Sequence, residues 1–342
     1  MTAVFCENAA DRSARTWEKQ LASFDRLEFA ISDAALGISK AVSQLAQARL
    51  DDPLAPTLEH GLDVFHTTME AKCVMRKQWR MTEAAWEKAE AADREVARSK
   101  QQGIDARGAA HTAHAAWGRA TALFEQAEHL EAAWGRAHAA LDLFRADGQL
   151  NDRGHARAEI AEALKGLTGA DWSKVRNFLD DPRSLSFLDR VHRRLARAEP
   201  DAGWREAMAW RWWLLHGRVR CSDPLRRLVR AVGRDRKLSE PEQASFDRVS
   251  AVLGDTFRAS SAVECMNSVL RMQQSRHKVM TQPMLDLKRL YWNSHEFRSG
   301  PRKKACPYQA LGLDWPTFDF WTLLQTDPKD LTQRLSTARN TE

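Results

Sequence analysis

The stretch Leu27-Glu-Phe-Ala-Ile-Ser-Asp33 decides how the first part of the chain folds. Its larger apolar residues fall at every second position, and this period of two is typical of a β-strand with one buried face. We expect the strand to end at Asp33. Ile38, Val42 and Leu45 then recur at the spacing of one helix face, so a helix should follow the strand.

Beyond that helix, residues 51–56 contain two Asp and two Pro and predict a loop. The short segment Leu62-Asp-Val-Phe-His66 is interpreted as a second strand. Residues 1–66 are therefore predicted to form part of an α/β core. An aspartate at a strand's carboxyl end, such as Asp33, either caps the next helix or joins the catalytic groups that gather at this edge of α/β sheets.

The composition changes at Thr67. From there to about Lys165, Ala, Glu, Lys and Arg dominate while Gly and Pro are scarce, which favours long helices. Helical patterning continues to about residue 236, and another helix is expected from about Pro283 to Phe297. We expect breaks between helices near residues 166–169, at Asp181-Pro182, at Glu199-Pro200 and at Gly254-Asp255.

Charge is unevenly distributed along the chain, whose formal net charge is +6. Residues 183–237 hold fifteen Lys/Arg and six Asp/Glu, and residues 271–304 hold nine and two. Two basic stretches suggest a polyanionic partner, most simply DNA. The alternative is that arginine-rich helix faces are merely solvated. Trp210, Trp212 and Trp213 could stack on bases, but we expect them to belong to the core.

Several classes of protein are disfavoured by composition. Five cysteines lie far apart without a Cys-x-x-Cys pair, which fits reduced thiols better than a disulfide framework or a zinc site. Charged residues interrupt the first apolar run, so no signal peptide is predicted. The most apolar stretch, residues 208–219, is too short to span a bilayer. A soluble protein of the cytoplasm is expected.

A second informative segment, residues 258–271, reads Arg-Ala-Ser-Ser-Ala-Val-Glu-Cys-Met-Asn-Ser-Val-Leu-Arg. Either serine can cap a helix here. On that helix one face carries a carboxylate flanked by amide, hydroxyl and guanidinium groups, because the spacing is i, i+3, i+4 and i+7. A surface helix with a Glu–Arg pair would have the same pattern. The residues concerned are Glu264, Asn267, Ser268 and Arg271.

This segment contains the sequence pattern Ser-Ser-x-Val-Glu-x-x-Asn-Ser-x-Leu-Arg. The pattern resembles the motif around the last acidic residue of DDE-type transposases from bacterial insertion sequences. The similarity continues through residues 285–293, 297–300, 306–312 and 321–324. Upstream, Ile31-Ser-Asp33 resembles the strand that carries the family's second acidic residue, and Asp63-Val-Phe-His66 resembles the strand after it. The resemblance covers roughly the first 70 and the last 80 residues.

The resemblance implies an α+β, RNase H-like catalytic core interrupted by an all-α insertion, with the chain predominantly helical overall. It assigns residues 1–66 and 255–325 to the core, 67–254 to the insertion and 326–342 to a flexible tail. In this family three carboxylates bind two Mg²⁺ (or Mn²⁺) ions for phosphoryl transfer. Asp33 would be the second acidic residue and Glu264 the last, with His66, Asn267 and Arg271 in support. Double-stranded DNA would be bound by Arg271, Arg276, Lys278, Lys288 and Arg289.

The family's first aspartate has no counterpart in this sequence. That aspartate lies on a strand upstream of everything matched here, and residues 3–6 correspond to a remnant of the third strand. Asp11 and Asp25 are poor substitutes, because one reads as a helix start and the other precedes the strand of Asp33. We therefore expect an N-terminally truncated transposase with weak or absent strand transfer by the chain alone.

The leading hypothesis is thus a transposase-like enzyme of a mobile element, associated with the nucleoid when bound to element ends and target DNA, and able to form a homo-oligomer. Two alternatives remain open. The first is a DNA-binding remnant without catalysis. The second is a helical, oligomeric interaction protein built on the block at residues 67–165. Salt-sensitive DNA binding is expected of the first two hypotheses but not of the helical interaction protein.

Overall fold

The computed structural model describes residues 11–24, 26–33, 35–50, 55–216, 236–256, 281–297, 303–310, 313, 315 and 317–331. The chain divides into two compact units, Trp17–Ser260 and Met1–Thr16 with Ser261–Glu342. The described residues are predominantly helical, and the sheet formed among them has two strands. A helical α+β protein is therefore confirmed at this level. The predicted joining of both chain ends in one core stays a prediction.

The two-stranded sheet is the first feature of the larger unit. After α1 (Ala14–Leu21), strand β1 (Phe29–Ser32) pairs in parallel with β2 (Glu59–Leu62), in a register that sets Ser32 opposite Leu62. Helix α2 (Leu36–Leu50) connects the strands and buries Val42, as its helical spacing predicted. Near the end of α2, Arg49 donates to the carbonyls of Phe24 and Leu27, which ties the helix to the start of β1. The strand–helix prediction is confirmed.

The second predicted strand was placed wrongly. Strand β2 ends at Leu62, and the segment expected to continue it opens helix α3 (Val64–Gln101) instead. Asp63 is the N-cap of α3, and its carboxylate accepts the Phe65 N–H at 2.8 Å. This cap outweighs the β-propensity of Val64 and Phe65 because it satisfies a free donor of the first helical turn.

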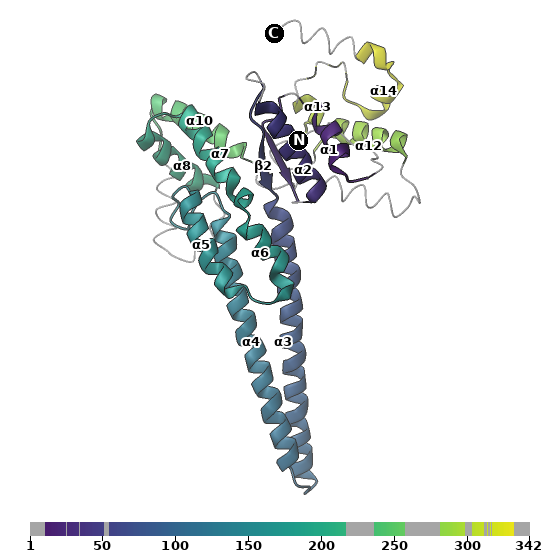
Figure 1. Cartoon of the computed structure of the whole chain (residues 1–342), viewed down its shortest axis with the longest axis vertical. Coiled ribbons are helices and arrows are strands. Elements are labelled where there is room, and N and C mark those ends of the chain that lie inside the picture. The colour runs from purple at the N-terminus through teal and green to yellow at the C-terminus, as the bar shows by residue number, and fades with distance from the viewer. Residues whose placement is uncertain are drawn as a thin grey trace. The chain divides into compact units, whose positions relative to one another are not determined.

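Helix α3 and α4 (Arg107–Ala140) form a long antiparallel hairpin, which we call the arm (Figure 1). Along α4 the buried residues Ala113, Ala120, Ala127 and Trp134 recur every seven positions, the period of a coiled-coil seam. Alanine dominates this seam, and its small side chain lets two helices pack closely without a third. The long helices predicted from composition are confirmed.

The helices that follow the arm, residues 153–198, pack against its base (Figure 1), and we call them the helical block. Its helices end at Gly166, Asp180 and Ala198, so the breaks predicted near those residues are confirmed. A tightly buried centre forms around Trp172, which lies 6.3 Å from Trp134 between ring centroids. The elements are α5 (Arg153–Gly166), η1 (Ala170–Trp172), α6 (Ser173–Asp180), η2 (Pro182–Leu185) and α7 (Ser186–Ala198).

A second core joins α7 to α8 (Ala202–His216) and α10 (Glu240–Gly254). Trp212 packs against this core and stacks on Phe144 with ring centroids 5.7 Å apart, as expected of a core residue, whereas Trp210 is 38% exposed. Gly148 has φ +87°, and a Cβ there would lie 2.6 Å from the Trp213 ring, so the position requires glycine.

The smaller unit contains α12 (Gln282–Ser294), α13 (Pro307–Ala310) and α14 (Phe320–Gln325). The helix predicted from Pro283 to Phe297 is α12, which ends three residues earlier because His295 takes an extended conformation. Cys73 and Cys306 are free thiols. Within the residues described above, no helix has the length and apolar character needed to cross a membrane.

Candidate functional site

Asp33, predicted at the carboxyl end of a strand, lies at one edge of the sheet beside Asp63, which was predicted within a strand. Because β1 and β2 run parallel, Asp33 follows one strand and Asp63 the other at the same edge. Asp33 is exposed, and its Oδ1 accepts the Ala35 N–H at 3.2 Å. This hydrogen bond uses one carboxylate oxygen, and the other oxygen is available to a second partner. Asp33 can therefore contribute to both roles that its position suggested.

This edge opens into a cavity of about 480 Å³, which we call the edge cavity. Its two walls come from parts of the chain far apart in sequence. One wall is formed at the sheet edge and the start of α3, by Asp33, Leu62, His66, Thr67 and Glu70. The opposite wall is formed by α6 and η2 of the helical block, with Lys174, Val175, Asn177, Phe178, Asp181 and Arg183.

Asp63 and His66 sit together in the first turn of α3, not on a strand. The Asp63 side chain is fully buried and lies 3.9 Å from His66, measured between Oδ2 and Nε2. The His66 side chain is 45% exposed. Thus His66 faces the edge cavity from a helix whose start is fixed by Asp63, and its predicted position at the end of a strand is wrong.

The helical block contributes two cationic groups to the edge cavity. Lys174 Nζ lies 3.1 Å from Glu70 Oε1, and the two side chains are 77% and 40% exposed. An ion pair this exposed is worth little, so the lysine can exchange its carboxylate for another anion. Arg183 instead forms a bidentate ion pair with Asp181, in which Nε lies 3.0 Å from Oδ1 and Nη2 lies 2.6 Å from Oδ2. Its planar guanidinium is committed to that geometry.

A polar chain links this wall to strand β1. Arg183 Nη1 lies 3.1 Å from His60 Nδ1, and His60 Nε2 lies 2.8 Å from Ser32 Oγ. Arginine can only donate, so Nδ1 accepts and Nε2–H donates to the serine. Burial, followed by the charge of Arg183, lowers the pKa of His60 to about 4, which keeps the ring neutral. The residue before Asp33 is thereby held by the helical block.

Sequence reasoning missed His60, Asp181 and Arg183. The Asp181-Pro182 pair was identified only as a helix break, and His60 carried no pattern of its own. One local signal was present, because Asp181 also accepts the Arg183 N–H at 2.9 Å and so fixes the turn that aims the guanidinium. The long-range partner 123 residues away could not be read from the sequence.

Five of the predicted residues fall outside the described ranges, namely Glu264, Asn267, Arg271, Arg276 and Lys278. The pairing of Asp33 with Glu264 therefore stays a prediction. Lys288 and Arg289, predicted to contact DNA, lie on α12 and are partly exposed. Arg289 Nη2 lies 3.3 Å from Asp286 Oδ1, within the same helix.

The donor chemistry at the sheet edge partly fits a magnesium ion. Mg²⁺ prefers carboxylate oxygens, and the exposed Asp33 supplies one such ligand. Asp63 is less suited because one of its oxygens already caps α3 and the side chain has no solvent access. Over the described ranges, no three His, Cys, Asp or Glu side chains cluster in a metal-binding arrangement. Of the two aspartates at the sheet edge, Asp33 therefore fits the ion and Asp63 does not.

The basic stretch at residues 183–237 is described at residues 183–216 and 236–237. Its described arginines are largely used inside the larger unit. Arg193 pairs with Glu59, Arg194 pairs with Asp255 at 2.7 Å, and Arg190 lies 4.3 Å above the Phe29 ring. These contacts fasten α7 to the sheet and to the end of α10. The charge of this segment therefore contributes to folding as well as to the surface.

No protein-family model matches the chain, and neither the curated proteins nor the solved structures contain a match to it.

Proposed function

We propose that the protein is a DDE-type transposase-like phosphoryl transferase that acts on double-stranded DNA through an RNase H-like core. The observation that carries the proposal is the edge cavity. An exposed carboxylate, Asp33, stands at the carboxyl edge of a parallel sheet, which is where α/β enzymes place their reactive groups. Lys174 faces the same cavity and can neutralise a phosphate.

In this proposal Asp33 and Glu264 would hold the Mg²⁺ or Mn²⁺ ion. When bound, the ion supplies Lewis-acid stabilisation of the phosphoryl oxygens and activates the attacking oxygen. Lys174 contributes a mobile positive charge, because its exposed pair with Glu70 is easily exchanged. His66, anchored beside Asp63, can donate to or accept from a group in the cavity. Asn267 and Arg271 would support Glu264.

DNA would be held chiefly by the second basic stretch. Lys288 and Arg289 on α12 belong to it, together with Arg271, Arg276 and Lys278. Contacts of this kind go to phosphates, so affinity should fall steeply as salt is added. The helical block has a different part, since it supplies one wall of the edge cavity and fixes Ser32 through His60.

Metal binding is the most direct test, because Asp33 and Glu264 act as metal ligands in this proposal. Mn²⁺ binding to the full chain should be measured by electron paramagnetic resonance, with and without DNA. Asp33→Asn and Glu264→Gln should each weaken it at least tenfold. Glu87→Gln, an exposed carboxylate on the arm, is the matched control and should bind Mn²⁺ like the parent.

The second readout is divalent-dependent nicking of supercoiled DNA that carries the gene with its flanking sequence. Any nicking should vanish in Asp33→Asn and persist in Glu87→Gln. If Mn²⁺ affinity is the same in all variants, the assignment of Asp33 as a ligand is wrong.

A DNA-binding protein without catalysis is the second candidate. It is favoured by one observation, that Asp63, the other aspartate at the sheet edge, has one oxygen engaged in capping α3 and no solvent access. It predicts salt-sensitive DNA binding without Mn²⁺ binding at Asp33. A helical interaction protein is the third candidate, favoured by the arm, and it predicts self-association with no salt-sensitive DNA binding.

A further inference from the structure

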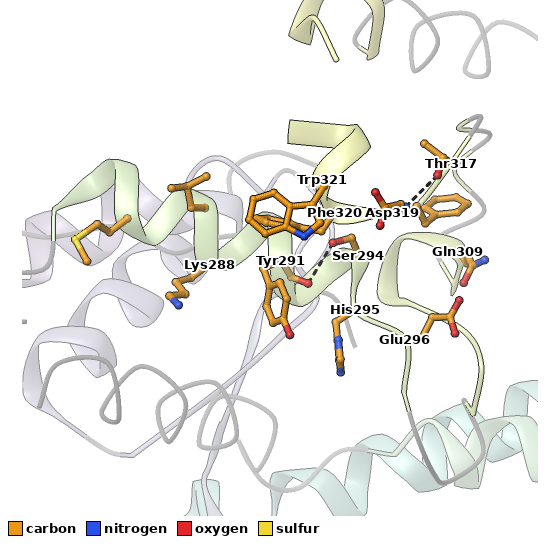
Figure 2. Close-up of a pocket in the computed structure, with 13 residues that line it drawn as sticks. Lys288, Tyr291, Ser294, His295, Glu296, Gln309, Thr317, Asp319, Phe320 and Trp321 are labelled. Atoms are coloured by element: carbon orange, nitrogen blue, oxygen red, sulfur yellow. Dashed lines mark hydrogen bonds between the residues drawn. The ribbon is translucent and has the colours of Figure 1, made fainter. Parts of the chain in front are cut away.

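The smaller unit contains a cavity of about 850 Å³ between α12 and α14, which we call the aromatic cavity (Figure 2). Its volume falls within the usual range of ligand-binding pockets. The end of α12 contributes Tyr291 and His295, and the start of α14 contributes Phe320 and Trp321. None of these residues was singled out as a site by the sequence.

The four rings form a continuous series. His295 stacks on Tyr291 with centroids 5.4 Å apart and planes inclined by 27°. Tyr291 meets Phe320 edge-on at 5.3 Å, and Phe320 meets Trp321 at 5.0 Å. Each ring is therefore held in place by its neighbour, and little rotamer freedom would be lost when a ligand binds.

The two largest rings of this series remain open to water. Trp321 is 67% exposed and Tyr291 is 47% exposed, and Leu287 beside them is 43% exposed. Large apolar side chains exposed next to one another mark binding surfaces in soluble proteins. Flat, rigid ring faces in particular suit a flat aromatic ligand, because offset stacking then removes both partners from water.

Polar groups at the rim limit what the ligand can be. Lys288 lines the cavity and makes no ion pair with any residue in the described part of the chain. Gln309 uses its Oε1 to accept the Cys306 N–H at 2.7 Å, which leaves its amide nitrogen to donate. Glu296 and Asp319 add carboxylate acceptors, and Asp319 already accepts from the N–H and the hydroxyl of Thr322. A cation beside ring faces with a donor and an acceptor at the rim matches a nucleotide, with phosphate, base plane and base edge.

We propose that the aromatic cavity binds an unpaired base of single-stranded DNA, stacked on Tyr291 and Trp321, with the adjoining phosphate on Lys288. The inference rests on the proposed function for DNA as partner and on none of its metal chemistry. The sequence in which Lys288 lies also favours a polyanionic partner, because residues 271–304 hold nine Lys/Arg against two Asp/Glu. Bases within a duplex are covered by their neighbours, so only an unpaired base can present its face.

The test uses a single-stranded oligonucleotide of thymidines with one 2-aminopurine, whose fluorescence is quenched when the base stacks on an aromatic ring. Titration with the full-length protein should quench it saturably. Trp321→Ala and Tyr291→Ala should each weaken binding about tenfold, the size expected for loss of one stacking partner. Trp321→Phe should retain most of the affinity, since a ring face is kept. Lys288→Gln should weaken binding and flatten its salt dependence.

Trp86→Ala is the matched control, because Trp86 is also an exposed tryptophan but lies on the arm in the larger unit. It should leave quenching unchanged. The proposal is overturned if Trp321→Ala and Tyr291→Ala both bind like the parent. It is also overturned if duplex DNA, or a strand of the same length in which every nucleotide is abasic, competes as well as the intact single strand.

Asp33→Asn and Glu264→Gln separate this inference from the proposed chemistry. Both variants should lose Mn²⁺ binding but keep quenching. If the parent protein quenches the probe but does not bind Mn²⁺, the base site is supported and the proposed phosphoryl transferase is contradicted. If it binds Mn²⁺ but does not quench the probe, the base site is contradicted and the proposed phosphoryl transferase is supported.

Discussion

Two regions of the larger unit are stabilised by opposite kinds of contact. One is the edge cavity, and the other is the part of the arm around residues 85–120, which we call the distal arm. In the distal arm, Ala85, Ala89 and Ala120 form a seam of small side chains, and the ion pairs outside it are exposed. At the edge cavity the corresponding contacts are polar and partly buried, running from Asp181 through Arg183 and His60 to Ser32. We therefore expect substitutions of charged residues to lower the free energy of unfolding at the edge cavity and to leave it nearly unchanged on the distal arm.

The largest expected effect compares two tryptophans. Trp172 is 2% exposed in the core that also contains Val175 and Phe178 of the cavity wall, whereas Trp86 on the distal arm is 38% exposed. Trp172→Ala should lower the free energy of unfolding by about 3–5 kcal/mol, because it removes a large ring from a closed core. Trp86→Ala should cost clearly less. Urea unfolding followed by circular dichroism measures both, and equal losses would contradict the contrast between the regions.

The second prediction concerns pH. The pKa of His60 is lowered from 6.5 to about 4 by burial and by Arg183. The unfolded chain therefore binds more protons between these values, and the stability due to neutral His60 is complete above pH 6.5 and lost as pH falls toward 4. The loss should be on the order of 2 kcal/mol after allowance for partial exposure. His60→Gln should remove that dependence, and an unchanged profile would rule out this role.

The third prediction breaks the polar chain itself. Arg183→Met keeps most of the side-chain length but leaves Asp181 without its fork and His60 without a donor. Loss of hydrogen bonds to a charged group should cost about 1–3 kcal/mol, towards the lower end because Arg183 is 35% exposed. Urea unfolding gives the cost, and Mn²⁺ affinity shows whether displacement of Ser32 reaches Asp33. A fully stable Arg183→Met would mean that the cavity wall is held by apolar contacts alone.

The smallest expected effect is on the arm. Arg98 lies 3.0 Å from Glu95, and the two side chains are 66% and 54% exposed. Arg98→Met, the same substitution as at Arg183, should change the free energy of unfolding by less than about 0.5 kcal/mol, because water screens an exposed pair. Thermal unfolding of both variants side by side gives the comparison. A loss as large as that of Arg183→Met would show that exposure does not distinguish the regions.

Local patterns predicted the elements of this protein well, because each depends on neighbours in sequence. The alternation around Phe29 and Ile31 gave β1, and the breaks at Asp181-Pro182 and Glu199-Pro200 appear where proline and capping groups end the helices. The error at residues 62–66 has the same origin. Val64 and Phe65 favour a strand by propensity, but the cap made by Asp63 decides for a helix.

The site was predicted less completely. Asp33 and His66 were named in advance, and both line the edge cavity. Lys174, Asp181 and Arg183 were not, since they belong to a block that looked merely helical. The aromatic cavity was missed as well, because the rings at 291 and 321 are brought together only when α12 and α14 pack.

By itself the sequence determined which segments are helices, where they end, and that a strand places Asp33 at its carboxyl end. These properties follow from spacing and capping over a few residues. Tertiary structure alone decided that the turn at Asp181–Arg183 holds His60 across 123 residues, and that Lys174 faces the edge cavity. Such partners are selected by packing of distant faces, and their hydrogen bonds form only after that packing has excluded water.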